Sequence, residues 1–135
     1  MPRILAVDDD PDVVRLLRLL LTCKGYDFVP AANGDQALQA LGRQPVDLVL
    51  LDVMMPVRDG LATLAAIRSS PPTRGLPVLM LTASGNEEHV RRAYELGANA
   101  FIAKPFAPSE LCSTISAWLA PPVPAPMVRS PVCVL

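Results

Sequence analysis

Cysteine is scarce in this 135-residue chain. The three cysteines are Cys23, Cys112 and Cys133, and no two of them form a CxxC pair. An odd number of widely spaced cysteines indicates neither a zinc site nor a disulfide framework, and a reducing compartment is the simplest setting for free thiols. Aromatic residues make up only 4% of the sequence. We therefore expect a cytoplasmic protein with an aliphatic core of Leu, Val, Ile and Ala.

An excess of charge of one sign is also missing. Twelve basic and 13 acidic side chains leave a net charge of −1, which argues against a nucleic-acid-binding face, so no direct DNA binding is expected. The sequence has no run of 18 apolar residues, so no membrane span is expected. Acidic residues from position 8 onwards exclude a secretory signal. No GxGxxG or Walker-type loop follows a predicted strand, which disfavours a nucleotide-binding enzyme.

What is present has the pattern of one globular domain. Hydrophobic residues make up 51% of the chain, enough for a real core in a domain of this length. Apolar runs alternate with amphipathic segments, which predicts five βα units: an α/β domain with a doubly wound, parallel five-stranded sheet, (βα)5. The predicted strands are 4–7, 26–30, 48–51, 76–81 and 100–103. The predicted helices are 11–24, 34–41, 60–69, 86–96 and 108–119.

Polar side chains stand where four of the five predicted strands end. Asp8 and Asp9 follow the first strand, Asp52 the third, Thr82 the fourth and Lys104 the fifth. Ligands of such sheets bind outside the carboxyl ends of the strands. Converging carboxylates raise one another's pKa, and a hard divalent cation such as Mg²⁺ relieves that repulsion. A cation and a lysine around an aspartate also match the needs of phosphoryl transfer to a carboxylate.

Four blocks of residues carry a family resemblance. The blocks are Val7-Asp8-Asp9-Asp10-Pro11, Leu51-Asp52-Val53-Met54-Met55-Pro56 with Asp59-Gly60, Leu81-Thr82-Ala83, and Phe101-Ile102-Ala103-Lys104-Pro105-Phe106. In their order and spacing the chain resembles the receiver domains of two-component response regulators, over residues 3 to 119. The resemblance implies a CheY-like domain with the flavodoxin-like strand order 2-1-3-4-5.

The resemblance also implies a phosphorylation site and a metal site. Asp52 would accept a phosphoryl group from the phosphohistidine of a sensor histidine kinase or of a phosphotransfer protein. Mg²⁺, with Mn²⁺ as a substitute, would be bound by Asp9 directly, by Asp8 through water, by Asp52 and by the backbone carbonyl of Met54. Asp10 is expected to cap a helix and not to bind metal.

Four further residues would complete the switch. Lys104 would contact a phosphoryl oxygen, and the Lys104–Pro105 bond would be cis. Thr82 would turn its hydroxyl toward the phosphoryl group, and Phe101 would move inward into the space that Thr82 leaves. Ala83 is small and would leave the site open to a bulky phosphodonor.

Three departures from the family pattern affect these expectations. Met54 and Ser84 occupy positions that flank the phosphoryl group, and Met54 cannot orient a water molecule, so slow autodephosphorylation is expected. Phe101 stands where a tyrosine would supply a hydroxyl. Asn99-Ala100 replaces an acidic pair that some members use to dimerise through their fourth and fifth helices.

The predicted organisation is a receiver domain at residues 1–120 and a Pro-rich tail, extended or disordered, at residues 121–135. We expect a stand-alone phosphoacceptor switch that acts by protein contact and is no enzyme beyond promoting its own phosphorylation and dephosphorylation. The alternative is an adaptor that works without phosphorylation. A phosphohydrolase of the haloacid dehalogenase type is disfavoured, because Met54 stands where that family needs a second aspartate. The sequence leaves open the kinase, the downstream partner and the oligomeric state.

Overall fold

A parallel five-stranded sheet forms the centre of the computed structural model, which describes residues 2–53, 59–82 and 87–119. The strand order is β2-β1-β3-β4-β5, as predicted, so β2 and β5 are the edge strands. The strands are β1 (Arg3–Val7), β2 (Asp27–Ala31), β3 (Leu48–Asp52), β4 (Val78–Thr82) and β5 (Ala100–Ala103). The helices are α1 (Pro11–Cys23), α2 (Gly34–Arg43), α3 (Gly60–Ser69), α4 (Glu87–Glu95) and α5 (Pro108–Leu119), with a short 3₁₀ helix, η1 (Pro71–Thr73).

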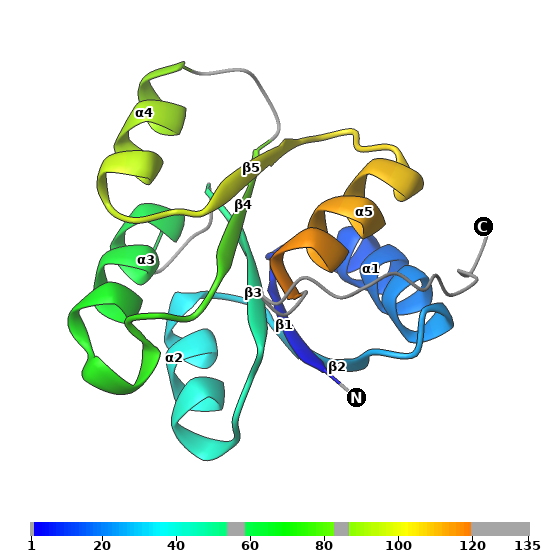
Figure 1. Ribbon diagram of the computed structural model, residues 1–135, viewed down its shortest axis with the longest axis horizontal. Helices are drawn as coiled ribbons and strands as arrows, with labels where there is room; N and C mark the ends of the chain where they lie inside the picture. Colours follow the sequence, from blue (N-terminus) through cyan, green and yellow to red (C-terminus); the bar gives the residue numbers. More distant parts are fainter. Residues whose placement is uncertain (1, 54–58, 83–86, 120–135) are drawn as a thin grey trace, which may run out of the picture.

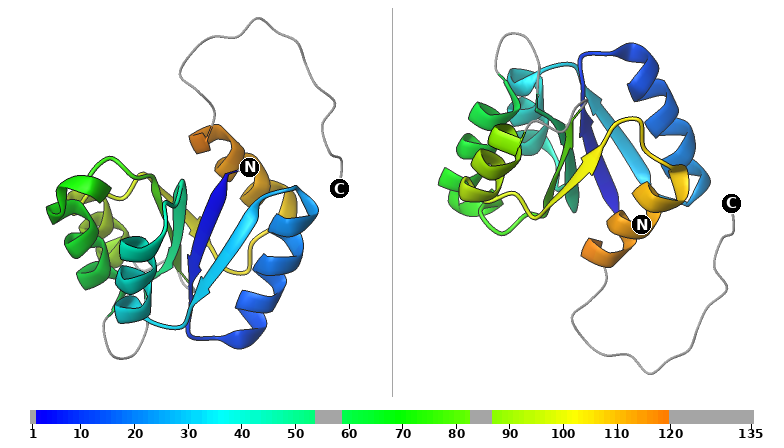
Figure 2. Two further views of the ribbon diagram at one scale, coloured as in Figure 1. Left: turned by 90° about the horizontal axis from the view of Figure 1, so that it is seen from below. Right: turned by 90° about the horizontal axis from the view of Figure 1, so that it is seen from above.

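Helices cover both faces of the sheet (Figure 1), with α1 and α5 on one side and α2, α3 and α4 on the other. The two end-on views in Figure 2 show the same three layers. Successive strand residues point to opposite faces, so each central strand contributes to both cores. In β3, for example, Leu48 and Leu50 pack toward α1 and α5, whereas Val49 and Leu51 pack toward the other layer. Burial on both faces explains the continuous apolar runs of β3 and β4.

Short polar side chains start three of the helices. Asp10 caps α1 by accepting a hydrogen bond from the Asp12 amide at 2.9 Å, which confirms the prediction for this residue. Asn33 caps α2 and Asp59 caps α3 in the same way. A side-chain oxygen at this position satisfies a backbone N–H that has no partner within the helix.

Several helix and strand limits differ from the predictions by one or two residues. The second helix was predicted to end at residue 41, but α2 continues through Arg43 and is followed by Gln44, whose backbone is extended. The predicted fourth strand began at Leu76, whereas β4 begins at Val78, and η1 was not predicted. Asp52 and Thr82 are the last residues of their strands and not the first residues of loops.

Arg68 ties together the loops at the amino-terminal edge of the sheet. Its guanidinium donates hydrogen bonds to the carbonyls of Leu76 at 2.7 Å and Gly97 at 2.9 Å, and to the Asn99 side chain at 2.8 Å. The same Asn99 oxygen accepts from the amide of Val78, also at 2.8 Å. Burial lowers the pKa of Arg68. The α3–β4 and α4–β5 connections are therefore held to the end of α3 by one side chain.

Replacing Arg68 with lysine is expected to lower the free energy of unfolding by about 2 kcal/mol. A lysine keeps the charge but cannot reach several carbonyls at once, and acceptors that are buried and lose a partner cost about 1–3 kcal/mol, of which these partly buried ones should show about the middle. Denaturant unfolding followed by circular dichroism measures the change. The matched control is Arg43→Lys at an exposed position at the end of α2, where a change within about 0.5 kcal/mol is expected. Equal stabilities of the two variants would contradict this role of Arg68.

Candidate functional site

Three carboxylates meet at the carboxyl-terminal edge of the sheet. Asp8 follows β1 and Asp52 ends β3, and both are buried, whereas Asp9 is exposed. One oxygen from each of the three lies within 4.8 Å of the others. The register explains the convergence, because Val7 is paired with Leu51 in the neighbouring strand, which brings the next residues of β1 and β3 side by side. The predicted acidic cluster is thus formed.

Lys104 supplies a positive charge to this cluster. Its ammonium lies 2.8 Å from an oxygen of Asp8 and 3.5 Å from an oxygen of Asp52, so it reaches past the end of β4 from the edge strand. Burial alone would lower the pKa of Lys104, but the hydrogen bond to Asp8 and the attraction of both carboxylates outweigh burial and raise the pKa. The Lys104–Pro105 bond is cis, as the resemblance implies.

The raised pKa of Lys104 predicts a loss of stability at alkaline pH. A lysine whose pKa is higher in the folded state contributes stability that is full below its unfolded pKa of about 10.4 and is lost as the pH rises through the folded pKa. We expect the free energy of unfolding of the wild type to fall more steeply above about pH 10 than that of Lys104→Met. Denaturant titrations across this range measure both slopes, and parallel curves would show that the ion pairs do not stabilise the fold.

Gly60 allows the first turn of α3 to lie against the backbone at the end of β3. The Gly60 amide donates to the Val53 carbonyl at 2.9 Å. A Cβ atom at this position would lie 2.1 Å from the Asp52 carbonyl oxygen and 2.8 Å from the Val53 Cα. Because both contacts are to backbone, no side-chain rotation can relieve them. Gly60 was part of the sequence block, but this contact was not predicted.

Thr82 lies at the edge of the sheet that carries the acidic cluster, and Phe101 lies within the edge strand β5. Thr82 is buried at the end of β4, between β3 and β5, and its carbonyl accepts from the Lys104 amide at 2.6 Å. Phe101 is half-buried in β5, and its ring lies 6.4 Å from the ring of Tyr94 in α4. Movement of either side chain stays a prediction. The predicted roles of Met54, Ala83 and Ser84 fall outside the described residues.

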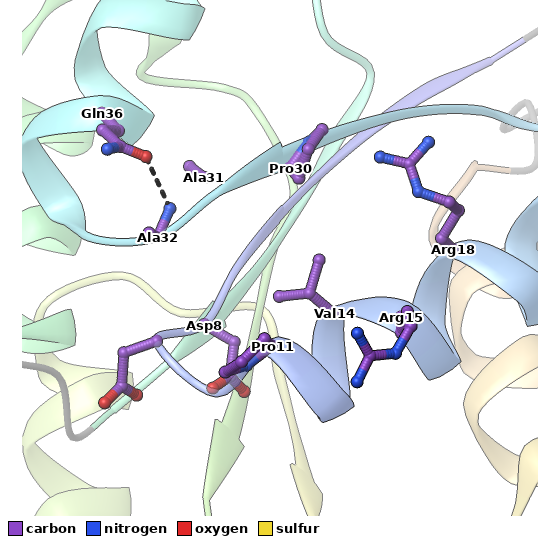
Figure 3. Close-up of a pocket in the computed structure, with 10 residues that line it drawn as sticks. Asp8, Pro11, Val14, Arg15, Arg18, Pro30, Ala31, Ala32 and Gln36 are labelled. Carbon is purple, nitrogen blue, oxygen red and sulfur yellow. Dashed lines mark hydrogen bonds between the residues drawn. The ribbon is translucent and has the colours of Figure 1, made fainter.

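A pocket of about 500 Å³ opens next to the acidic cluster (Figure 3), between α1 and the segment that follows β2. Arg15 and Arg18 approach it from α1, while Gln36 closes the other side and accepts a hydrogen bond from the Ala32 amide. Arg15 pairs with Asp12 within α1, and Arg18 stacks over the Phe28 ring at 5.0 Å. The pocket is lined by Asp8, Asp9, Pro11, Val14, Arg15, Arg18, Pro30, Ala31, Ala32 and Gln36. Sequence reasoning did not predict it, although Arg15 and Arg18 have the spacing of neighbours on one helix face.

The donor set of the acidic cluster suits Mg²⁺. Oxygen ligands at about 2.1 Å in an octahedron lie about 3–4 Å from one another, and the three carboxylate oxygens need only a small movement to reach that spacing. The exposed side chain of Asp9 can make it without disturbing the core. Lys104 compensates for part of the negative charge but leaves the cluster with excess carboxylate, so a divalent cation would complete the balance.

Comparisons with known proteins match this geometry. Residues 4–116 match the family model of the response regulator receiver domain. The chain is 44% identical over 119 residues to the transcriptional regulatory protein CpxR of Escherichia coli, covering 88% of this chain and 50% of CpxR. It is 39% identical over 115 residues to the phosphate regulon transcriptional regulatory protein PhoB of Klebsiella pneumoniae. This match covers 85% of this chain and 50% of PhoB. The chain therefore spans about half the length of these curated relatives.

Solved structures have the same fold as the described part of the chain. A putative response regulator from Chloroflexus aurantiacus superimposes with a TM-score of 0.85 at 39% identity, covering 88% of this chain and 98% of that one. The chemotaxis protein CheY4 of Vibrio cholerae gives a TM-score of 0.85 at 32% identity, and the match covers 88% of this chain and 99% of CheY4.

Within residues 2–53, 59–82 and 87–119, every helix is too short or too polar to cross a membrane.

Proposed function

Because the chain belongs to the response regulator receiver domain family, we propose that it is a phosphoacceptor switch in which Asp52 receives a phosphoryl group. The donor would be the phosphohistidine of a sensor histidine kinase or of a phosphotransfer protein. One observation carries the proposal: Asp52 is buried at a strand end, within contact distance of the Lys104 ammonium and beside the carboxylates of Asp8 and Asp9.

The described residues support an in-line transfer. An oxygen of Asp52 attacks the phosphorus, the P–N bond to the donor imidazole breaks, and an acyl phosphate forms; the departing imidazole takes a proton from solvent. Lys104 neutralises charge on the phosphoryl oxygens, since its ammonium already lies 3.5 Å from Asp52. Mg²⁺ bound by Asp8, Asp9 and Asp52 would supply further neutralisation of those oxygens. Thr82 ends β4 at the same edge of the sheet, and its hydroxyl would turn toward the phosphoryl group.

Intact-mass spectrometry after incubation with Mg²⁺ and acetyl phosphate tests the proposal. The wild type is expected to gain one phosphoryl group and Asp52→Asn none, because the amide is not a nucleophile. Asp35→Asn, at an exposed position in the first turn of α2, is the matched control and should behave as the wild type. A folded wild type that binds Mg²⁺ but gains no mass would overturn the proposal in favour of the phosphorylation-independent adaptor.

The remaining parts of the proposal concern partners and context. The phosphorylated form would act through contact with a downstream protein and would lose its phosphoryl group slowly, because Met54 cannot orient water. Relatives of about twice the length are named as transcriptional regulators, so the absence of direct DNA binding stays a prediction. A cytoplasmic location, the absence of further enzymatic activity and the division into a receiver domain and a tail also stay predictions.

A further inference from the structure

Helix α1 carries more apolar surface than the sheet can cover. Its inner face contributes Leu17 and Leu21 to the core, fully buried. A second stripe recurs with the spacing of one helix face and consists of Leu16, Leu19 and Cys23, whereas Leu20 packs partly against the core. Leu16 is 43% exposed and Leu19 67% exposed, and Cys23 is exposed as a free thiol. A helix that packs on a sheet with one face needs no second apolar face, so this stripe requires another explanation.

Charged side chains do not interrupt the stripe. The two arginines of α1 turn toward β2, where Arg15 and Arg18 line the pocket beside Pro30. The neighbouring helix, α5, contains a single charged residue, Glu110, in its first turn. Its last turn presents Trp118, which is 41% exposed and is the only tryptophan of the chain. The layer formed by α1 and α5 thus holds three of the four exposed large apolar side chains of the described residues.

The chain continues from α5 with a segment that could cover this stripe. Helices α1 and α5 lie against each other (Figure 1), and both run back from the carboxyl ends of their strands, so both end at the same edge of the layer. Leu119 ends α5 there, and 16 residues follow. At about 3.1 Å per residue, a Pro-rich segment of this length reaches about 50 Å, whereas α1 is about 20 Å long.

The composition of residues 120–135 favours contact with an apolar surface over full exposure to water. Nine of the 16 residues are apolar, five are proline and one, Arg129, is charged. Segments that stay disordered are enriched in proline, as this one is, but they are also usually poor in apolar residues and rich in charge. The apolar residues gather at the end of the segment, where Val132, Cys133 and Val134 are consecutive. The prolines oppose helix formation, so an extended strap is the form this sequence favours.

We propose that residues 127–135 pack on the Leu16–Leu19–Cys23 stripe of α1, with residues 120–126 as the connection from α5. The tether favours this occupant over a second copy, because a segment on a short linker is present at millimolar effective concentration. The surface area of two exposed leucine side chains is also far smaller than the roughly 800 Å² per partner that a stable dimer buries. This inference does not depend on phosphorylation of Asp52.

Cross-linking between native cysteines in the full chain tests the strap. Leu19 lies about 6 Å along the helix axis from Cys23, so a strap seated on Leu19 brings Cys133 within reach of that thiol, while Cys112 is buried. A short bis-maleimide at low protein concentration is expected to join Cys23 to Cys133 within one chain, identified by intact mass and peptide mapping. Leu19→Glu is expected to lower the yield at least fivefold, and Val134→Asp should do the same without altering any described residue.

Tyr94→Glu is the matched control, because Tyr94 is a 48% exposed apolar residue on the opposite layer, and its yield should equal that of the wild type. A free tail would also meet Cys23 by diffusion, so dependence on Leu19 and Val134 is the decisive result. Equal yields in all variants, or no link at all, would overturn the strap. A link that joins two chains would assign the stripe to a second copy instead.

Discussion

Replacing Gly60 with alanine is expected to lower the free energy of unfolding by about 3 kcal/mol, at the upper end of the usual cost of overpacking. The added Cβ would lie 2.1 Å from the Asp52 carbonyl oxygen, and only a shift of β3 or α3 can relieve this contact. That shift also moves the carboxylate of Asp52, so phosphorylation by acetyl phosphate should slow. Denaturant unfolding and the rate of phosphoryl mass gain measure the two effects.

Gly42→Ala is the matched control for the same change of residue. Gly42 lies in the last turn of α2 with no atom within 4 Å of its added Cβ. Alanine is a better helix former, so a gain of about 0.5–1 kcal/mol is expected. If both alanines stabilise the protein, the close approach of α3 to Asp52 is not a constraint on this fold.

Replacing Asp9 with asparagine is expected to remove most of the stabilisation that Mg²⁺ provides. A ligand present at 100 times its Kd stabilises the folded state by about 2.7 kcal/mol. Loss of a direct ligand should raise the Kd about 100-fold, since even outer-sphere partners contribute 10–100-fold. At the same Mg²⁺ concentration the gain then falls to about 0.4 kcal/mol. Thermal or denaturant unfolding with and without Mg²⁺ gives this difference directly.

Asp10→Asn is the control that distinguishes direct ligation of Mg²⁺ by Asp9 from a general effect of removing one negative charge. Asp10 lies next to Asp9 but caps α1, and asparagine caps a helix as well as aspartate does. This variant should keep nearly the full response to Mg²⁺. If both variants lose the response equally, the cation is attracted by the overall negative charge of the loop, and Asp9 is no specific ligand.

The fold could be predicted because its signals are local. The apolar runs of β3 and β4 and the cap Asp10 each act on their own neighbours. The limits shifted where pairing extended a strand: Asp52 is held in register with Leu81 of β4, so β3 includes it. The predicted end of α2 at residue 41 was two residues too early, because the following Gly42 permits a helix to end but does not force it to.

The site could be predicted because the carboxyl ends of parallel strands meet at one edge. That rule brought together Asp8, Asp52 and Lys104 from three distant parts of the chain. The contacts of Gly60 and Arg68 could not be predicted from the sequence, because each depends on residues that only the folded chain brings near. The partners of Arg68, for instance, lie between 5 and 31 positions away.

The hydrogen bonds of Arg68 fix the carboxyl end of α4, so a tilt of this helix would move mainly its amino end. Arg68 binds the segment that follows α4 to the end of α3 through Gly97 and Asn99, whereas the helix begins at Glu87, after β4, on the side of the acidic cluster. A tilt of about 10° would displace the first turn of this nine-residue helix by about 2 Å and leave the last turn in place. A partner whose affinity depends on such a tilt would have to bind α4 near Glu87, at the end that moves.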